Sequence, residues 1–223
     1  MDKNKIKYKY KKEKNKKPIY IFAIIIILII SLILFKINYK SKKYGNNISN
    51  KTSEEITEYI LNISSYSTTI DVTIESNKNT NKYVLKQEYS KENNISKQIV
   101  ELPSNIEGLT TTFDGTNLNI ENSKIGLNKI YENYKELTEN HLFLETFIKD
   151  YNESENKKID ERGDTIEIIV KLKNESNKYS IYKKLYIDKK TGKPLKLEVQ
   201  DINKKIKIYI LYNEININST NNN

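Results

Sequence analysis

The chain has no cysteine and no tryptophan, and its 223 residues include only one histidine, one arginine, three prolines and six glycines. The missing cysteine excludes disulfides, thiolate metal sites, thiol nucleophiles and a lipid-modified N-terminal cysteine. The glycines form no phosphate-cradling loop, because Gly126, Gly163 and Gly192 lie far apart in the sequence. A domain without disulfides must be held together by its core, and about 150–180 residues are enough to bury one.

The single histidine, His141, limits the catalytic mechanisms that the chain could use. A serine nucleophile would need His141 as its base, and the sequence contains no Gly-x-Ser-x-Gly elbow. His141 lies between Glu139 and Glu145, next to a candidate helix cap. We expect it to be an inert surface residue.

Carboxylates offer the remaining route to catalysis or metal binding. Asp160, Glu161 and Asp164 cluster around Gly163, but their spacing fits no calcium loop, and a solvated turn explains them equally well. A pair of carboxylates for glycoside hydrolysis stays open, because their separation is a three-dimensional quantity. The sequence therefore predicts no catalytic, cofactor-binding or metal-binding residue, and we expect that the protein is not an enzyme.

One long uncharged run, Ile19–Phe35, follows a lysine-rich start. Met1–Lys17 carries nine lysines and two acids, whereas four lysines follow the run within Lys36–Lys43. Seventeen uncharged residues are at the short end of a membrane-spanning helix, and the excess of lysine on the N-terminal side favours a cytoplasmic N-terminus. A cleaved signal peptide would end in small residues, which are absent here, and a buried core helix would rarely hold eight isoleucines in twelve positions.

The run divides the chain into five predicted parts. Residues 1–17 are a cytoplasmic basic tail, 18–36 a transmembrane anchor and 37–51 a polar tether. Residues 52–218 form one extracytoplasmic domain, and 219–223 a disordered tail. We expect a single-pass membrane protein with a cytoplasmic N-terminus and an extracytoplasmic C-terminal domain.

The net charge of +9 belongs to the membrane flanks. Met1–Lys43 sums to +11, so the remaining 180 residues sum to −2. A basic patch is the usual electrostatic sign of nucleic-acid binding. The domain has no basic surplus, and we therefore expect no nucleic-acid partner.

Hydrophobic periodicity predicts an α+β domain that begins with a helix. Thr52 and Glu55 form a capping box, and Ile56, Tyr59, Ile60 and Ile63 follow at helical spacing. From Tyr66 onward the period changes to two, which predicts antiparallel strands with one apolar and one wet face. The predicted strands contain or span Ile70–Ile74, Tyr83–Tyr89, Ile99–Leu102, Leu109–Asp114 and Leu118–Glu121.

A second helix should interrupt the strands, capped by Thr138 or Asn140, with Leu142, Phe143 and Phe147 on its apolar face. Strands then resume at Ile166–Leu172, Tyr179–Ile187, Leu195–Val199 and Ile206–Tyr212. We expect reversals at Lys91–Asn94, at Gly115–Asn117, at Asp188–Pro194 and at Asn203–Lys204, where glycine and polar residues favour turns.

The closing run Leu185–Val199 reads LYIDKKTGKPLKLEV, and Tyr212–Ile215 reads YNEI. This run and the order of elements over Thr52–Asn218 resemble the LolA-like superfamily of exported lipoprotein carriers, and within it the GerS-like branch of spore germination proteins. The resemblance implies a strongly curved antiparallel sheet, a half-barrel with helices packed on its concave face. GerS-like members are commonly lipoproteins, whereas this chain has no cysteine to acylate, so the transmembrane helix would replace the lipid.

Three functions follow from these observations. The resemblance implies a non-enzymatic, membrane-tethered partner of a cell-wall peptidoglycan amidase, acting in spore-cortex modification and germination. It also implies a location in the spore or cell envelope of a Gram-positive-type bacterium. A lipid- or lipoprotein-binding module is the alternative, although Ile56, Ile60, Phe143 and Phe147 would fill the cavity that it needs. An envelope hydrolase is the third. Unpaired strands at the sheet edge also make a homodimer by strand exchange possible.

Overall fold

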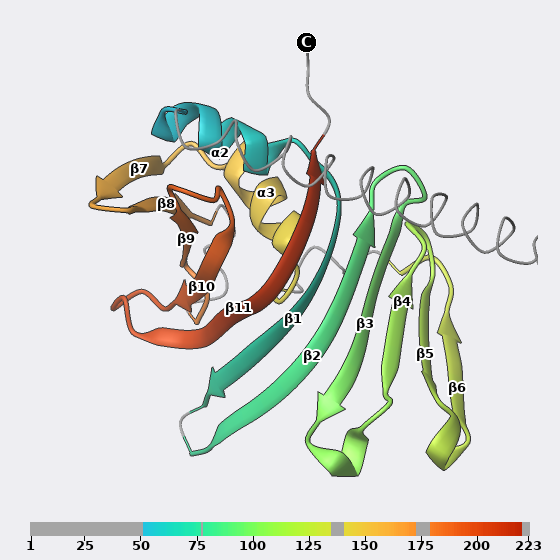
Figure 1. The fold of residues 1–223 in the computed structure, drawn as a ribbon. Helices are drawn as coiled ribbons and strands as arrows, with labels where there is room; N and C mark the ends of the chain where they lie inside the picture. Colours follow the sequence, from blue (N-terminus) through green and yellow to red (C-terminus); the bar gives the residue numbers. More distant parts are fainter. Residues whose placement is uncertain (1–50, 77, 135–140, 173–178, 220–223) are drawn as a thin grey trace, which may run out of the picture. The chain divides into compact units, whose positions relative to one another are not determined.

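A computed structural model of the chain describes residues 51–76, 78–134, 141–172 and 179–219 (Figure 1). The chain divides into two compact units, Met1–Asn46 and Asn47–Asn223, and all described residues belong to the second. The predicted tail and anchor (residues 1–36) and the tether up to residue 50 lie outside the described residues. Within the described ranges, no helix is both long enough and apolar enough to cross a membrane.

The described residues form one antiparallel sheet of eleven strands, with two α-helices and two short 3₁₀ helices (Figure 1). The strands are β1 (Ile63–Glu75), β2 (Thr80–Ser90), β3 (Ile95–Leu102), β4 (Thr110–Phe113), β5 (Leu118–Asn122), β6 (Leu127–Tyr131), β7 (Lys157–Arg162), β8 (Thr165–Lys171), β9 (Tyr182–Asp188), β10 (Pro194–Gln200) and β11 (Ile206–Ser219). The helices are α2 (Ser53–Leu61), α3 (Leu144–Glu153), η1 (Ser104–Ile106) and η2 (Ser123–Ile125). The α+β class and the antiparallel pairing are confirmed.

The strand order is β6-β5-β4-β3-β2-β1-β11-β10-β9-β8-β7, so the first and last strands lie side by side in the middle of the sheet. The register between β1 and β11 shifts between Thr69 and Ile70, which marks a bulge. Bulges bend strands and increase their twist. Figure 1 shows the sheet strongly curved, with α2 and α3 on the concave face.

The core lies between this concave face and the two helices. Alternate residues of β1 point inward, and Tyr66, Ile70 and Val72 are buried there. Ile56 and Ile60 of α2 and Leu144 and Phe147 of α3 join the same cluster. Helix side chains therefore fill the concave face beside β1, as the sequence predicted for Ile56, Ile60 and Phe147.

Helix α2 confirms the predicted capping box. The Thr52 hydroxyl accepts a hydrogen bond from the Glu55 amide at 3.2 Å, and the Glu55 carboxylate accepts one from the Thr52 amide at 2.7 Å. The helix ends at Leu61, and only Asn62 separates it from β1. The prediction that Ile63 continues the helix stripe was wrong, because Ile63 is the first residue of β1.

Helix α3 begins later than predicted. Its N-cap residue is Phe143, which makes no side-chain cap, and its first residue is Leu144. The predicted capping by Thr138 or Asn140 is therefore wrong, because Phe143 occupies the N-cap position. Thr138 and Asn140 themselves lie outside the described residues. The first helical amide is instead bound from outside the helix, as the next section describes.

All four predicted reversals are turns between strands. In the β9–β10 turn the Asp188 carboxylate accepts hydrogen bonds from the Thr191 amide at 2.6 Å and hydroxyl at 2.8 Å, and Gly192 adopts a φ of +66°. A left-handed backbone of this kind favours glycine. Pro194 then opens β10.

Two strands were not predicted, and a third was predicted to end too early. β6 and β7 were not predicted, although each forms a hairpin with its neighbour, β5 and β8 respectively. β11 was expected to end at Tyr212, yet it continues to Ser219, which pairs with Ile63. Ser219 therefore belongs to the sheet and not to a disordered tail, and residues 220–223 lie outside the described residues.

Candidate functional site

Helix α3 carries a set of buried polar side chains into the concave face. Glu145, in the first turn, accepts hydrogen bonds from the Tyr66 hydroxyl of β1 at 2.6 Å and from the Ser96 hydroxyl of β3 at 2.7 Å. The Tyr66 hydroxyl also accepts a hydrogen bond from the Leu144 amide at 3.2 Å, which replaces the missing side-chain cap. Burial raises the pKa of Glu145 although both hydroxyl hydrogen bonds oppose the change, and burial together with Glu145 raises the pKa of Tyr66.

The following turns of α3 hold a largely buried ion pair. The Lys183 side chain of β9 is fully buried and pairs with Asp150, and its Nζ lies 3.5 Å from the Thr146 hydroxyl. Burial lowers the pKa of Lys183 despite the attraction of Asp150, and burial raises the pKa of Asp150 despite the attraction of Lys183. Burial therefore outweighs the mutual attraction for both partners, which is the usual balance for an ion pair removed from water.

Two further hydrogen bonds tie the ends of this helical segment to the sheet. The Gln87 side chain of β2 donates to the Leu142 carbonyl at 3.2 Å, and the Ser154 hydroxyl, just after α3, donates to the Lys171 carbonyl of β8 at 2.7 Å. Phe143 and Phe147 are almost fully buried beside these contacts. Helix α3 is thus held at both ends, and polar as well as apolar contacts determine its position.

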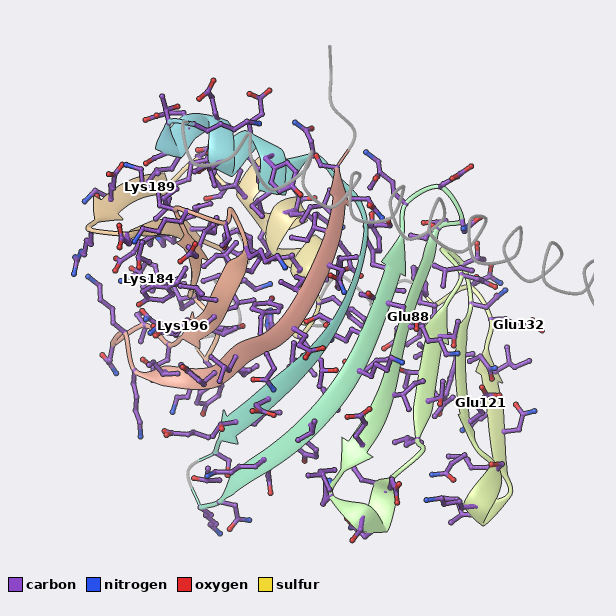
Figure 2. All side chains as sticks on the ribbon, in the orientation of Figure 1. Glu88, Glu121, Glu132, Lys184, Lys189 and Lys196 are labelled. Atoms are coloured by element: carbon purple, nitrogen blue, oxygen red, sulfur yellow. The ribbon has the colours of Figure 1, made fainter. Side chains whose placement is uncertain are left out.

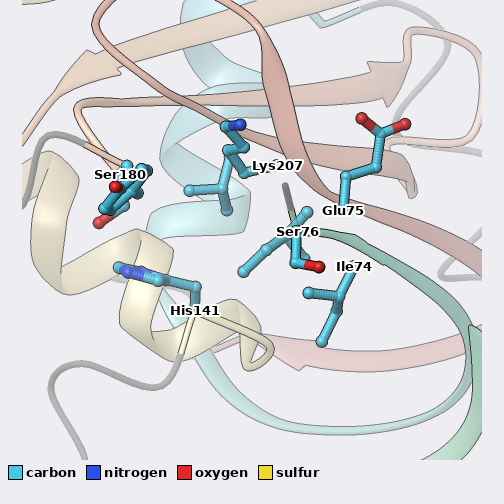
Figure 3. A pocket seen from close by; sticks show the side chains of 9 residues that line it. Ile74, Glu75, Ser76, His141, Ser180 and Lys207 are labelled. Carbon is cyan, nitrogen blue, oxygen red and sulfur yellow. The ribbon is translucent and has the colours of Figure 1, made fainter. Parts of the chain in front are cut away.

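A cleft of about 360 Å³ remains open at one end of this packed interior (Figure 3). Ile74 of β1, Val199 of β10 and Ile208 of β11 are apolar lining residues. His141, on the segment that leads into α3, also lines the cleft (Figure 3). The other lining residues are Glu75, Ser76, Tyr179, Ser180 and Lys207. This volume is at the lower end of the range for small-molecule sites, which is about 300–1,000 Å³.

His141 is the least ordinary group in the cleft. Its Nδ1 atom is buried and has no hydrogen-bond partner among the described residues. Burial, with a smaller effect from the nearby Lys183 charge, lowers the pKa of His141 to about 4. The ring is therefore neutral near pH 7. The expectation of a surface histidine was wrong, because His141 is half-buried in the cleft.

The charged groups of the cleft are already paired. Lys207 lies 3.7 Å from Asp201, and Glu75 lies 3.8 Å from Lys205. Ser76, Ser180 and Glu75 also line the cleft, and none of them makes a hydrogen bond with His141 Nδ1. The apolar walls suit the binding of an apolar group.

A wider depression of about 690 Å³ lies where β1 and β2 meet the end of β3. Asp71 and Lys82, two of its polar lining residues, are exposed to solvent, and Leu102 is an exposed hydrophobic residue at its rim. None of its lining residues has a buried side-chain polar atom without a hydrogen-bond partner, in contrast to His141 in the cleft.

The carboxylates around Gly163 do not converge on a shared site. Asp160 pairs with Lys158 at 2.7 Å and Asp164 pairs with Lys190 at 2.6 Å, while Glu161 accepts from Ser53 and Lys189. They lie on or beside the β7–β8 hairpin. No group of histidine, aspartate and glutamate side chains in the described ranges could hold a metal ion.

Sequence reasoning missed the buried polar set on α3. One signal was present: Lys183 alternates with Leu185 and Ile187 on the inward face of β9, so a lysine occupies an apolar position. A charge on an otherwise apolar face predicts a buried partner. The partner itself, Asp150, comes from a different element and had no local signal.

The described residues thus form a strongly curved antiparallel sheet with two helices on its concave face and a cleft of mostly apolar walls. The chain belongs to the family of YdcC-like sporulation proteins, whose family model matches residues 16–223. The sequence prediction of a sporulation protein of this kind is confirmed at the level of the family. No curated protein gives a significant match.

Solved structures of similar proteins include relatives of the predicted kind. A chain in the complex of the CwlD amidase with the GerS lipoprotein from Clostridioides difficile is 25% identical, with 74% of this chain and 95% of that chain covered and a TM-score of 0.48. The LolA superfamily protein NE2245 from Nitrosomonas europaea is 12% identical, with coverages of 76% and 94% and a TM-score of 0.38. An uncharacterized conserved protein from Thermus thermophilus is 10% identical, with coverages of 76% and 89% and a TM-score of 0.49. The family assignment rests on the family model and not on these superpositions.

Proposed function

We propose that the protein is a membrane-tethered interaction module that binds and regulates a peptidoglycan amidase during spore formation. The observation that carries this proposal is the packed interior. Polar contacts tie α3 and the residues that flank it to β1, β2, β3, β8 and β9. Phe143, Leu144 and Phe147 are buried in the same interior. A domain with such an interior acts through its surface.

The membrane tether rests on the sequence. Residues 18–36 are proposed to span the membrane once, with the basic tail in the cytoplasm and the folded domain outside. The lysines of the tail would lie near anionic headgroups, where each contributes roughly 1 kcal/mol of attraction. A tether of this kind keeps the domain at the membrane surface, close to the cell wall that an amidase modifies.

The class of partner follows from family membership and from the resemblance of the Leu185–Val199 hairpin to GerS-like proteins. The solved pairing of the CwlD amidase with the GerS lipoprotein names the kind of enzyme to test first. We therefore propose that this chain also pairs with an amidase, and that the transmembrane helix takes the place of the lipid anchor.

The test uses the full-length chain in detergent micelles and the purified amidase of the sporulating cell. We expect saturable binding by biolayer interferometry, with no binding of an amidase from growing cells as the control. Deletion of the gene should change the muropeptides of the spore cortex. Unchanged cortex muropeptides in the deletion strain would contradict the proposed function.

The cleft at His141 favours a second candidate, the binding of a small apolar ligand. Its walls are apolar, and the neutral ring of His141 would meet an uncharged polar group. Native mass spectrometry of the full-length chain released from micelles should then show a co-purified ligand. His141→Phe should remove this ligand, whereas the exposed Ile202→Glu should not, and the absence of any adduct would exclude this candidate.

A further inference from the structure

The two edges of the sheet differ in their protection against pairing with another strand. Five of the six residues of β7 are charged, namely Lys157, Lys158, Asp160, Glu161 and Arg162. β6, at the other edge, has the sequence LNKIY and only one charged residue, Lys129. Charged side chains are a common device that keeps an edge strand from pairing with another chain. The β7 edge has this device, and the β6 edge lacks it.

The β6 edge is also accessible and apolar. Four of its five residues are exposed, with Ile130 61% and Tyr131 38% exposed. Figure 1 shows α2 and α3 away from β4, β5 and β6, so that no described helix covers this part of the concave face. Phe113 of β4 and Leu118 and Ile120 of β5 are accordingly only half-buried.

We propose that the edge of β6 takes an extended segment of a partner protein, which pairs antiparallel with it as an additional strand. This inference rests on the proposed function, because it gives the interaction module its docking surface. Backbone hydrogen bonds along the edge would supply affinity, and alternate side chains would supply specificity. Antiparallel pairing matches the rest of the sheet.

The register of β6 determines which side chains the partner must present. Tyr131 pairs with Leu118, and Lys129 pairs with Ile120, so Leu127, Lys129 and Tyr131 share the concave face, while Asn128 and Ile130 point to the other face. Lys129 Nζ lies over the Tyr131 ring at 4.7 Å and makes no ion pair with the described residues. An acidic side chain opposite Lys129, with apolar ones opposite Leu127, Ile130 and Tyr131, would match this edge.

Nearby acids do not cancel this preference for an acidic partner residue. Glu121 is one residue away from Ile120, the partner of Lys129, so it points to the opposite face of the sheet. Glu132 follows the last residue of β6. Figure 2 shows Glu121 and Glu132 at this end of the sheet, and Lys184 and Lys196 on the far strands.

A second copy of the chain fits the edge less well. Two β6 strands that pair antiparallel over all five residues must be centred on Lys129, which puts the two ammonium groups directly opposite each other. Like charges in that position are destabilising. Any other register of the same symmetry pairs fewer strand residues. The earlier prediction of a homodimer by strand exchange stays a prediction and would not use this full register.

The first experiment uses a defined peptide probe, Thr-Val-Val-Glu-Thr-Val-Thr, and the same peptide with lysine in place of glutamate. We expect the acidic peptide to slow hydrogen–deuterium exchange in residues 127–131 of the full-length chain in micelles. The lysine peptide should bind about fivefold more weakly, and Lys129→Glu should reverse this order. Absence of protection at 127–131 would overturn the proposal. Protection that increases with protein concentration in peptide-free samples would assign the edge to a second copy, which also overturns it.

The second experiment separates this surface from the proposed function. Ile130→Glu adds a charge to the edge, and Ile202→Glu is its matched control, since Ile202 is 63% exposed and lies in the turn between β10 and β11. We expect Ile130→Glu to weaken amidase binding at least tenfold and Ile202→Glu to leave it unchanged, with both variants folded by circular dichroism. Equal amidase binding by both variants would overturn the docking surface and leave the proposed function intact. Peptide binding at β6 without any amidase binding would overturn the proposed function and leave the docking surface intact.

Discussion

The buried pair between Lys183 and Asp150 allows the sharpest quantitative prediction. Asp150→Asn keeps the shape and the acceptor oxygen of the side chain but removes its charge, so that the fully buried Lys183 ammonium loses its counterion. Removal of one partner from a buried pair costs about 3–5 kcal/mol. Deprotonation of the lysine sets a ceiling, because neutralising a group with a reference pKa of about 10.4 at pH 7 costs about 4.6 kcal/mol. We therefore expect a loss of about 3–4.6 kcal/mol in the free energy of unfolding.

The same helix offers a matched control. Lys149 and Glu153 form an exposed i,i+4 pair at 3.8 Å, and Glu153→Gln removes one charge just as Asp150→Asn does. Exposed helix pairs contribute about 0.3–0.5 kcal/mol, so Glu153→Gln should lose no more than that. Urea unfolding of the full-length chain in micelles, followed by circular dichroism of the sheet, measures both variants.

The pH dependence distinguishes this mechanism from a simple packing defect. Without Asp150 the folded-state pKa of Lys183 falls further below that of the unfolded chain, so the unfolded state binds more protons over the range between the two values. The stability of Asp150→Asn should therefore rise with pH above 7, by up to about 1.4 kcal/mol per pH unit, relative to wild type. A loss below about 1 kcal/mol with no added pH slope would refute the reasoning that burial dominates at this pair.

Two further predictions concern the cleft and the core. His141 has a folded pKa of about 4, below its unfolded value of about 6.5, so its contribution is fully present above pH 6.5 and is lost as the pH falls toward 4, by up to about 3 kcal/mol. His141→Gln should therefore flatten the acid limb of a stability-against-pH profile, and identical limbs for both proteins would contradict this. Phe147→Ala removes a fully buried ring and should cost about 3–5 kcal/mol, measured as a shift of the urea midpoint, whereas Phe113→Ala, at a half-buried position, should cost clearly less.

Features encoded by neighbouring residues were predictable from the sequence. The capping box needs only Thr52 and Glu55, and the β9–β10 turn needs only Asp188, Thr191 and Gly192, all within a few residues of one another. Alternation likewise identified β1 because Ile70, Val72 and Ile74 share one face. In each case the physical cause acts over a few residues, and the pattern is visible without knowledge of the fold.

The missed features depend on pairs that are distant in sequence. Tyr66 and Glu145 are 79 positions apart, and Thr146 and Lys183 are 37 apart. β7 is rich in charged residues because it is an edge, so it lacks the apolar alternation that predicts a buried strand. The amide of Leu144, the first residue of α3, donates a hydrogen bond to the Tyr66 hydroxyl of β1, and no residue near the helix start indicates that contact.

The two candidate functions also differ in how many contacts of α3 they would break. Admission of a large ligand beneath α3 would separate Lys183 from Asp150 and Glu145 from Tyr66 and Ser96, and each buried group left without its partner costs roughly 1–3 kcal/mol, more where it is charged. Attachment of a strand to β6 breaks none of these contacts, since β6 is a terminal strand that pairs only with β5 among the described strands. The packed interior therefore opposes the opening of the domain. The unprotected β6 edge, in contrast, can accept a strand without the loss of these contacts. A partner that binds through β6 would leave the stability of α3 unchanged, whereas a ligand that lifts α3 would be opposed by every contact that holds the helix.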